Sequence, residues 1–469
     1  MSSQISLITF LSIHHLLFAE EILKKENYSV QILPLPSGIN SFCTKGLAFD
    51  ADKEKDVQKI LYRNNIAVEG FHRLTQKREI SEALNQVPSK LIYLNNAATS
   101  FPKPKSVYQA VRESFKIGSS PQRSQDLAGD RILYDARKSL AKLFHLDRFY
   151  QIIFTFNATD SLNLALLGFL KPGDHLITSS LEHNSVIRPL LYLKKKGISF
   201  TKILTTPEGK INLKEIERSL RKNTKLFVFT HASNVIGTLL PIEEIGEIAK
   251  KHKIIFLLDA AQTAGSYPID LSRLNIDLLA FTGHKSLFGL PGTGGLIIRE
   301  GINLTPLRFG GTGSQTKDEN QPEVLPDKYE SGTPNLPGII GLSQGIEFIL
   351  KEGLLKVRKK EIFLTETFLS GLRKIKDIVL YGPEDSSQQM PVISFNLKGY
   401  SPSEVGALLE RKYGIISRAG LHCSPWAHQT VGTYPSGTVR FSPGYFNTEE
   451  EIDALVNSLK ELTKKVFRV

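Results

Sequence analysis

From residue 91 onward, short apolar runs alternate with amphipathic segments along most of the chain. Short apolar runs predict buried strands, and segments such as Ser161–Phe169 and Ile242–His252 predict helices between them. The predicted strands are Gln151–Thr155, His175–Ser179, Lys225–Thr230, Ile254–Asp259, Leu278–Thr282 and Gly295–Arg299. This alternation favours an α/β fold with a large, doubly wound, mostly parallel sheet and helices on both faces.

The chain on either side of this alternation predicts further units. Residues 1–72 predict a small α/β N-terminal domain, and the polar residues 73–89 suit a linker. The small unit has predicted strands at Ile5–Phe10, Val30–Leu33, Leu47–Asp50 and Ile66–Phe71 and helices at Leu16–Lys25 and Lys53–Asn64. Residues 90–469 would form one region, with a large domain at about 105–335 and a small α+β domain at about 336–469 plus 90–104. The small domain has a predicted helix from Ile339 through Lys360 and on, a strand at Val392–Leu397, and helices at Pro402–Lys412 and from Glu449.

Composition excludes several classes of protein. With 41% hydrophobic and 23% charged residues, a disordered chain is not expected. The net charge is +12, but no dense Lys/Arg block is present, so we expect a basic surface and no nucleic-acid partner. The apolar run Ile5–Ala19 contains His14 and His15 and is too short to span a bilayer, so no membrane partner is expected. Only two cysteines, Cys43 and Cys423, are present, which favours a reducing compartment, and we predict a cytoplasmic protein.

Polar residues follow the predicted strands at the end where ligands collect in open α/β sheets. The five segments are Asn157–Asp160, Leu181–Asn184, Thr230–Asn234, Asp259–Gln262 and Thr282–Lys285. A lysine there can form a Schiff base with an aldehyde cofactor, and a carboxylate can keep a pyridine nitrogen protonated. A helix N-terminus can bind a phosphate, and a histidine can stack on the ring. Each residue alone also suits a helix cap or a surface position, but the five segments together indicate a site for pyridoxal 5'-phosphate (PLP).

Six motifs in the same region carry a resemblance to a known family. They are Ile92–Ser100, Asp259–Gln262, Thr282–Lys285, Glu330–Asn335, Arg418–Cys423 and Val439–Thr448. On these motifs, residues 91–466 closely resemble the class V aminotransferase group of PLP enzymes of fold type I. Within that group they are most similar to the cysteine desulfurase and selenocysteine lyase branch, above all in the Arg-Ala-Gly-x-His-Cys segment.

The resemblance implies a role for each matching residue. Lys285 would carry PLP, Asp259 would pair with its pyridine nitrogen, and Gln262 would hydrogen-bond the ring oxygen. His183 would stack on the ring and move protons, and Asn234 would lie near the cofactor and substrate. The implied phosphate ligands are Ala158, Thr159, Thr282 and His284. Gly332 and Thr333 resemble a loop that reaches the phosphate of a neighbouring subunit, which implies a homodimer. Arg440, helped by Arg418, would bind the substrate carboxylate.

Cys423 would take sulfur from the substrate as a persulfide. A free thiol has a pKa of about 8.5, so the attacking thiolate needs nearby positive charge, for which Arg418 and His422 are the candidates in sequence. Two alternatives exist: a buried apolar cysteine, or a metal site with His422 and His428. No metal site is expected, because further cysteines to complete a zinc site are lacking.

Three positions depart from the pattern of the family. Asn95 stands where many relatives have Asp, Asp160 replaces the usual Glu, and Asp126 replaces a histidine. These changes concern substrate handling and leave the expected core chemistry in place.

Residues 5–72 resemble a small family of sulfur/selenium carrier-like domains. The resemblance rests on Phe10, Ala19–Glu20, the Pro34–Pro36 turn, Ser41–Cys43 and Gly46, although Leu35, Ser37 and Thr44 depart from the pattern. It raises the hypothesis that Cys43 is a persulfide acceptor for Cys423. A purely structural role for Cys43 stays equally open.

The resemblance therefore implies a PLP-dependent cysteine desulfurase that converts L-cysteine to L-alanine. Within PLP enzymes, the alternatives are a selenocysteine lyase or a class V aminotransferase, the latter having no use for Cys423. From a different class, the alternative is a non-catalytic sulfur or selenium delivery protein. The expected partners are L-cysteine or L-selenocysteine, a sulfur or selenium acceptor protein, and a second copy of the chain.

Overall fold

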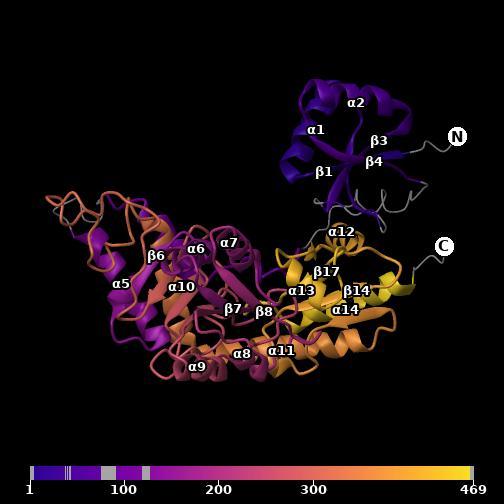
Figure 1. Cartoon of the computed structure of the whole chain (residues 1–469). Coiled ribbons are helices and arrows are strands. Elements are labelled where there is room, and N and C mark those ends of the chain that lie inside the picture. Colours follow the sequence, from indigo (N-terminus) through magenta and orange to yellow (C-terminus); the bar gives the residue numbers. More distant parts are fainter. Residues whose placement is uncertain are drawn as a thin grey trace.

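The structure is a computed structural model that describes residues 5–36, 39, 41, 44–74, 91–118 and 127–464 (Figure 1). Three sheets of four or more strands organise it: one in the N-terminal domain, a large central one, and one near the C-terminus. Among the described residues, no helix combines the length and apolar character needed to cross a membrane.

The N-terminal domain is an antiparallel sheet covered by helices on one face. Its strands lie in the order β2 (Gln31–Pro34), β3 (Lys45–Asp50), β1 (Ile5–Phe10) and β4 (Val68–Leu74), with η1 (Ala51–Lys53), α1 (Ile13–Lys25) and α2 (Glu54–Arg63) between them. Side chains alternate along β1, so Ile8 and Phe10 pack with the helices while Leu7 packs on the other face with Leu35. The predicted elements are all present. Helix α1 begins earlier than predicted because the Ser12 hydroxyl accepts a hydrogen bond from the His15 amide.

The large sheet has the order β6-β12-β11-β10-β9-β7-β8. The strands are β6 (Ile152–Thr155), β7 (His175–Ser179), β8 (Ser199–Ile203), β9 (Thr224–Thr230), β10 (Ile255–Asp259), β11 (Leu278–Thr282) and β12 (Gly294–Ile298). Strand β12 runs antiparallel to both of its neighbours, and the other pairs are parallel. Six of these strands agree with the predicted ones, and β8 at the edge was not predicted.

Helices cover both faces of this sheet. Along β9, Phe227 and Phe229 point to one apolar cluster, while Leu226 and Val228 point to another. Helices α5, α9 and α10 contribute to the first cluster, and α6 and α7 to the second. The helices of this part are α4 (Lys105–Ser114), α5 (Ala128–Phe144), η2 (Phe149–Gln151), α6 (Ala158–Phe169), α7 (Asn184–Lys194), α8 (Leu213–Arg218), α9 (Ile242–Lys251) and α10 (Leu336–Glu352).

A second, antiparallel sheet in the order β13-β14-β17-β16 forms the small α+β part. Its elements are α11 (Leu354–Arg373), β13 (Ile378–Tyr381), η3 (Ser386–Gln388), β14 (Ile393–Leu397), α12 (Pro402–Tyr413), β15 (Ile415–Ile416), β16 (Arg418–Gly420), α13 (Pro425–Thr430), β17 (Thr438–Phe441) and α14 (Glu449–Lys464). Strand β5 (Ile92–Tyr93) pairs with β15, which ties the segment after residue 90 to this part. The predicted fold class, a large doubly wound sheet with a small α+β part and a small α/β N-terminal domain, is confirmed.

The single helix predicted from Ile339 through Lys360 is wrong. The chain forms two helices, α10 and α11, which are separated by Gly353. Gly353 adopts φ 88°, a conformation that a residue with a side chain rarely accepts, and its amide caps α10 by donating to the Ile349 carbonyl. A helical pattern of apolar residues that continues across such a glycine does not reveal the break.

The N-terminal domain contacts the small α+β part through α12, as Figure 1 shows for the indigo and yellow segments. The Ser401 hydroxyl, at the start of α12, donates a 2.8 Å hydrogen bond to the Leu35 carbonyl. A Cβ atom placed on Gly420 would lie 3.0 Å from Cγ2 of Thr44. The two ends of the loop between β2 and β3 therefore lie against the small α+β part, with Leu35 at the start of α12 and Thr44 beside Gly420, three residues before Cys423.

Candidate active site

Asp259 and Lys285 lie at the carboxyl ends of neighbouring strands. Asp259 ends β10 and is buried, and its Oδ1 accepts a 2.9 Å hydrogen bond from the Ala261 amide. Burial raises the pKa of Asp259, while the positive charge of Lys285 acts in the opposite direction. Lys285 follows β11, and burial, with a smaller effect of Arg440 and Arg418, lowers its pKa to about 8 although Asp259 acts against this. An amine with a lowered pKa is a better nucleophile toward an aldehyde at neutral pH.

His183 is held at the N-terminus of α7 as a neutral imidazole. Its Nδ1 accepts a 3.1 Å hydrogen bond from the Ser185 amide, which leaves the ring proton on Nε2. Burial, with the charges of Lys285, Arg418, Arg440 and Arg188, lowers its pKa to about 3. The Ser185 hydroxyl lies 2.8 Å from Nδ1 and 2.7 Å from the Thr159 hydroxyl, so it links His183 to the start of α6.

The start of α6 and the residues at the end of β11 carry polar groups that lack hydrogen-bond partners within the described residues. Asn157 caps α6 by accepting from the Asp160 amide, and Ala158 and Thr159 occupy the first turn, whose amides lack partners within a helix. In the part of the chain that the structure describes, Thr282 Oγ1 and His284 Nδ1 are buried and have no hydrogen-bond partner. These unpaired atoms fit an anionic group such as the phosphate of PLP.

Arg440 is a buried cation that faces only neutral partners among the described residues. It is 1% exposed; its Nη1 donates to the Asn234 carbonyl at 2.8 Å and its Nη2 to Asn95 Oδ1 at 3.2 Å. Its Nε has no partner within the described ranges. Burial lowers its pKa to about 9, and the charge of Arg418 acts in the same direction. Because Asn95 is neutral where an aspartate would pair with it, Arg440 keeps its charge available for an anionic ligand.

Cys423 lies on a turn between β16 and α13 with its side chain exposed. Arg418 Nη2 donates to Cys423 Sγ at 3.3 Å. His422 and Cys423 adopt φ values of 49° and 63°, which residues with side chains rarely accept, and each such residue costs about 1–3 kcal/mol.

Three hydrogen bonds hold this turn. The Asn184 amide donates to the Cys423 carbonyl at 2.8 Å, and Asn234 Nδ2 donates to the His422 carbonyl at 2.7 Å. The Ser424 hydroxyl donates to Asn234 Oδ1 at 2.6 Å. Asn234 therefore uses both ends of its side-chain amide to fix the turn that carries the thiol.

His422, one of the two residues that the sequence suggested as a source of positive charge for Cys423, does not supply it. It is 2% exposed, and its Nε2 lies 3.0 Å from the Thr438 hydroxyl. Burial lowers its pKa well below the usual value, so the ring is neutral. The left-handed turn directs the two side chains apart, and Arg418 alone of the two candidates reaches the sulfur.

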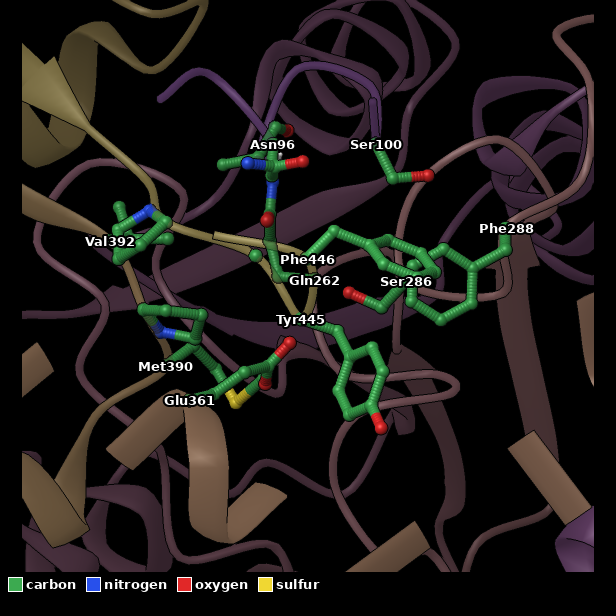
Figure 2. A pocket seen from close by; sticks show the side chains of 14 residues that line it. Asn96, Ser100, Gln262, Ser286, Phe288, Glu361, Met390, Val392, Tyr445 and Phe446 are labelled. Atoms are coloured by element: carbon green, nitrogen blue, oxygen red, sulfur yellow. Dashed lines mark hydrogen bonds between the residues drawn. The ribbon is translucent and has the colours of Figure 1, made fainter. Parts of the chain in front are cut away.

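Three other predicted residues line two pockets. Gln262 Nε2 donates to the Ala97 carbonyl at 3.2 Å, and its side chain lines a narrow pocket with Ser100, Ser286 and Glu361 (Figure 2). Gly332 and Thr333 are exposed and line a separate hollow beside Phe154 and Arg308. Cys43 and Asp126 lie outside the described residues. Among the residues that are described, no group of three His, Cys, Asp or Glu side chains is arranged to hold a metal ion.

Two residues close to His183 in the sequence were not predicted as site residues. Ser185 links His183 to Thr159, as described above. Glu182 is fully buried beside His183, accepts a 3.0 Å hydrogen bond from the Thr230 amide, and has a pKa raised to about 8, mainly by burial. The only signal in the sequence was their position next to His183, because burial of a particular glutamate depends on tertiary contacts.

The chain belongs to the Aminotransferase class-V family, which it matches over residues 92–455. Members of this family depend on PLP, and the unpaired donors, the buried Asp259 and Lys285 described above fit that cofactor. Residues 6–73 match the family described as "Putative Se/S carrier protein-like". Both resemblances found in the sequence are thereby confirmed.

Among its relatives are proteins named as cysteine desulfurases. The chain is 34% identical over 393 residues to a "Probable cysteine desulfurase" of Pyrococcus abyssi, covering 80% of this chain and 95% of the relative. It is 30% identical over 399 residues to a "Cysteine desulfurase" of Escherichia coli O157:H7, covering 82% and 95%. The apo structure of cysteine desulfurase from Thermococcus onnurineus NA1 superposes with a TM-score of 0.75 at 33% identity, covering 83% of this chain and all of that one. The cysteine desulfurase CsdA of Escherichia coli gives a TM-score of 0.71 at 26% identity, covering 83% and 99%.

Proposed function

We propose that this chain is a cysteine desulfurase that converts L-cysteine to L-alanine and retains the sulfur as a persulfide on Cys423. The observation that carries the proposal is the exposed thiol of Cys423 with Arg418 Nη2 at 3.3 Å, on a turn hydrogen-bonded to Asn184, the residue after His183. The desulfurases among its relatives support the same activity.

Each residue of the site would act in a defined way. Lys285 would hold the cofactor, Asp259 and Gln262 would contact its ring, and His183 would stack on it. The phosphate would lie between the α6 N-terminus, with Ala158 and Thr159, and the unpaired Thr282 and His284. Arg440, with Arg418, would bind the substrate carboxylate. The carboxylate would supply the negative counter-charge that the neutral hydrogen-bond partners of Arg440 do not.

PLP supplies an electron sink that weakens the bond between the substrate's carbon and its sulfur. The Cys423 thiolate, stabilised by Arg418, attacks that sulfur. A sulfur–sulfur bond forms as the carbon–sulfur bond breaks, and the electron pair stays with the carbon skeleton. The carbon takes up the proton that the substrate's thiol gives up, and alanine leaves.

The test is an assay of alanine and sulfide with PLP-loaded protein. Wild type should form alanine from L-cysteine, Lys285→Ala should lose the visible absorbance of bound PLP and activity by at least ~10³-fold, and Cys423→Ser should keep the absorbance but lose desulfuration. Transamination at the wild-type rate in Cys423→Ser would indicate an aminotransferase instead. Comparing L-selenocysteine with L-cysteine in the same variants distinguishes a selenocysteine lyase, because a more reactive carbon–selenium bond depends less on the thiol.

We also propose that the N-terminal domain is the first sulfur acceptor, with Cys43 as the receiving thiol. The Cys43 thiolate would attack the outer sulfur of the Cys423 persulfide, forming a new sulfur–sulfur bond and releasing the Cys423 thiolate. The support is that Thr44, which follows Cys43 in the sequence, packs against Gly420, and that Ser401 donates to Leu35. After a pulse of cysteine, mass spectrometry should find the added sulfur on both cysteine peptides. Sulfur on the Cys423 peptide alone would contradict the transfer.

Further proposals follow from the family. Gly332 and Thr333 would reach the phosphate site of a second copy in a homodimer, which light scattering of the purified protein would test. The domain boundaries would be 1–72, a linker at 73–89, and 90–469. The two cysteines support a reducing compartment, the cytoplasm, and a separate acceptor protein would take the sulfur onward.

A further inference from the structure

The segment between β5 and α4 hydrogen-bonds the backbone that carries Lys285. The Ser100 amide and the Thr99 hydroxyl each donate to the His284 carbonyl at 3.0 Å. The Ser100 hydroxyl lies 2.8 Å from the Lys285 carbonyl, and Lys103 Nζ donates to the His284 carbonyl at 2.8 Å. These residues come from the segment that pairs with the small α+β part, so the peptide before Lys285 is held from outside its own strand.

Lys103 is an unusual member of this group. It is 8% exposed, and its ammonium donates to two neutral oxygens, Ser100 Oγ at 2.8 Å and the His284 carbonyl. Within the described ranges it forms no ion pair with a carboxylate. Burial lowers its pKa to about 8, and its charge contributes to the lowered pKa of His284. Burying an ammonium without a counter-charge is unfavourable, so a lysine in this position needs a function that offsets the loss.

We propose that Lys103 is a positioning residue for the cofactor site: its ammonium fixes the His284 carbonyl and so orients the peptide between His284 and Lys285. Rotation of that peptide would move the Lys285 amine and the His284 imidazole together. His284 Nδ1 is one of the unpaired buried atoms that fit the phosphate, so both attachments of PLP depend on this peptide. The role rests on PLP as the cofactor and is independent of which substrate the enzyme uses.

The experiment compares PLP-loaded wild type with Lys103→Met, which keeps the length of the side chain and removes its donors. Lys105→Met is the matched control, because Lys105 is exposed two residues away. The measurements are the rate of PLP release, the absorbance of bound PLP between pH 6 and 10, and kcat and KM for cysteine. We expect Lys103→Met to release PLP about 10-fold faster, as for the loss of one charged hydrogen bond, to shift the pH midpoint, and to lower kcat at unchanged KM.

A folded Lys103→Met protein with wild-type PLP release and a wild-type pH profile would overturn the proposal, even if its melting temperature fell. Should this variant not fold, Ser100→Ala keeps the ammonium and removes one donor to the same carbonyls. It should change PLP release in the same direction by a smaller factor, and wild-type release would again overturn the role. If wild type binds no PLP, the proposed function fails before Lys103 is considered, which separates the two outcomes.

Discussion

Lys285 follows a buried strand of the large sheet and is partly enclosed, whereas Cys423 is exposed on a strained turn of the small α+β part. The segment 99–103 holds the peptide before Lys285, and the large domain holds the Cys423 turn through Asn184 and Asn234. The backbone at Lys285 is thus held by a segment that pairs with the small α+β part, and the backbone at Cys423 is held by residues of the large domain. The buried side therefore suits binding of a cofactor, and the exposed thiol suits the sulfur transfer proposed above.

Arg440 connects the two regions, and its replacement should have the largest effect of the variants below. Arg440→Lys keeps one charge but cannot hold Asn234, Asn95 and a carboxylate together. We expect kcat/KM for cysteine to fall about 100-fold, mainly through KM, while the absorbance of bound PLP persists. Steady-state kinetics check this, with the exposed Arg411→Lys as the control. A loss confined to kcat would mean that Arg440 does not bind the substrate.

Glu182 belongs to the buried side and should make stability depend on pH. Its pKa is raised from about 4.3 in an unfolded chain to about 8, so the folded state keeps a proton that the unfolded state loses. This contribution is fully present below pH 4.3 and is lost as pH rises toward 8. Relative to wild type, Glu182→Gln should therefore gain stability with pH between 5 and 7, by up to about 1.4 kcal/mol per pH unit. Urea unfolding of the PLP-loaded proteins measures the difference, and a flat difference would show that Glu182 is ionised in the fold.

Replacing Ser424 tests whether the reactivity of Cys423 depends on the hydrogen bonds that hold its turn. Ser424→Ala removes the hydrogen bond to Asn234 Oδ1, which should loosen the turn by about 1 kcal/mol. Persulfide formation on Cys423 should slow about fivefold without a change in bound PLP. Ser436→Ala, an exposed serine after α13, is the control. Equal rates in both variants would mean that the turn keeps its conformation without the hydrogen bond between Ser424 and Asn234.

Ser401 should have the smallest effect. Its hydroxyl caps α12 by accepting from the Glu404 amide and donates to the Leu35 carbonyl. Ser401→Ala should lower stability by about 1 kcal/mol. It should also slow sulfur transfer to the N-terminal domain, whereas Ser12→Ala, which removes only the cap of α1, should not. Quantitative mass spectrometry of the two cysteine peptides measures the sulfur transferred in each variant. Equal transfer in both variants would mean that the hydrogen bond between Ser401 and Leu35 is not needed for transfer to the N-terminal domain.

Six of the seven strands of the large sheet, and the residues at their carboxyl ends, could be predicted from the sequence alone. Asp259, Thr282 and Lys285 could be predicted because apolar runs mark the strands and parallel strands end at one edge of a sheet. Motifs then linked these residues to one cofactor. The break at Gly353 and the edge strand β8 were missed, because a helical pattern can cross a glycine and an edge strand is only partly buried.

The contacts between residues far apart in the chain could not be predicted from the sequence. Arg418 reaches Cys423 while His422 turns inward, since two left-handed residues set the directions of their side chains. Asn95 meets Arg440 and Lys103 meets His284 across separations of well over a hundred residues, which no local pattern encodes. Local sequence reports burial and backbone preference, whereas hydrogen bonds and charges between distant segments depend on how the domains pack.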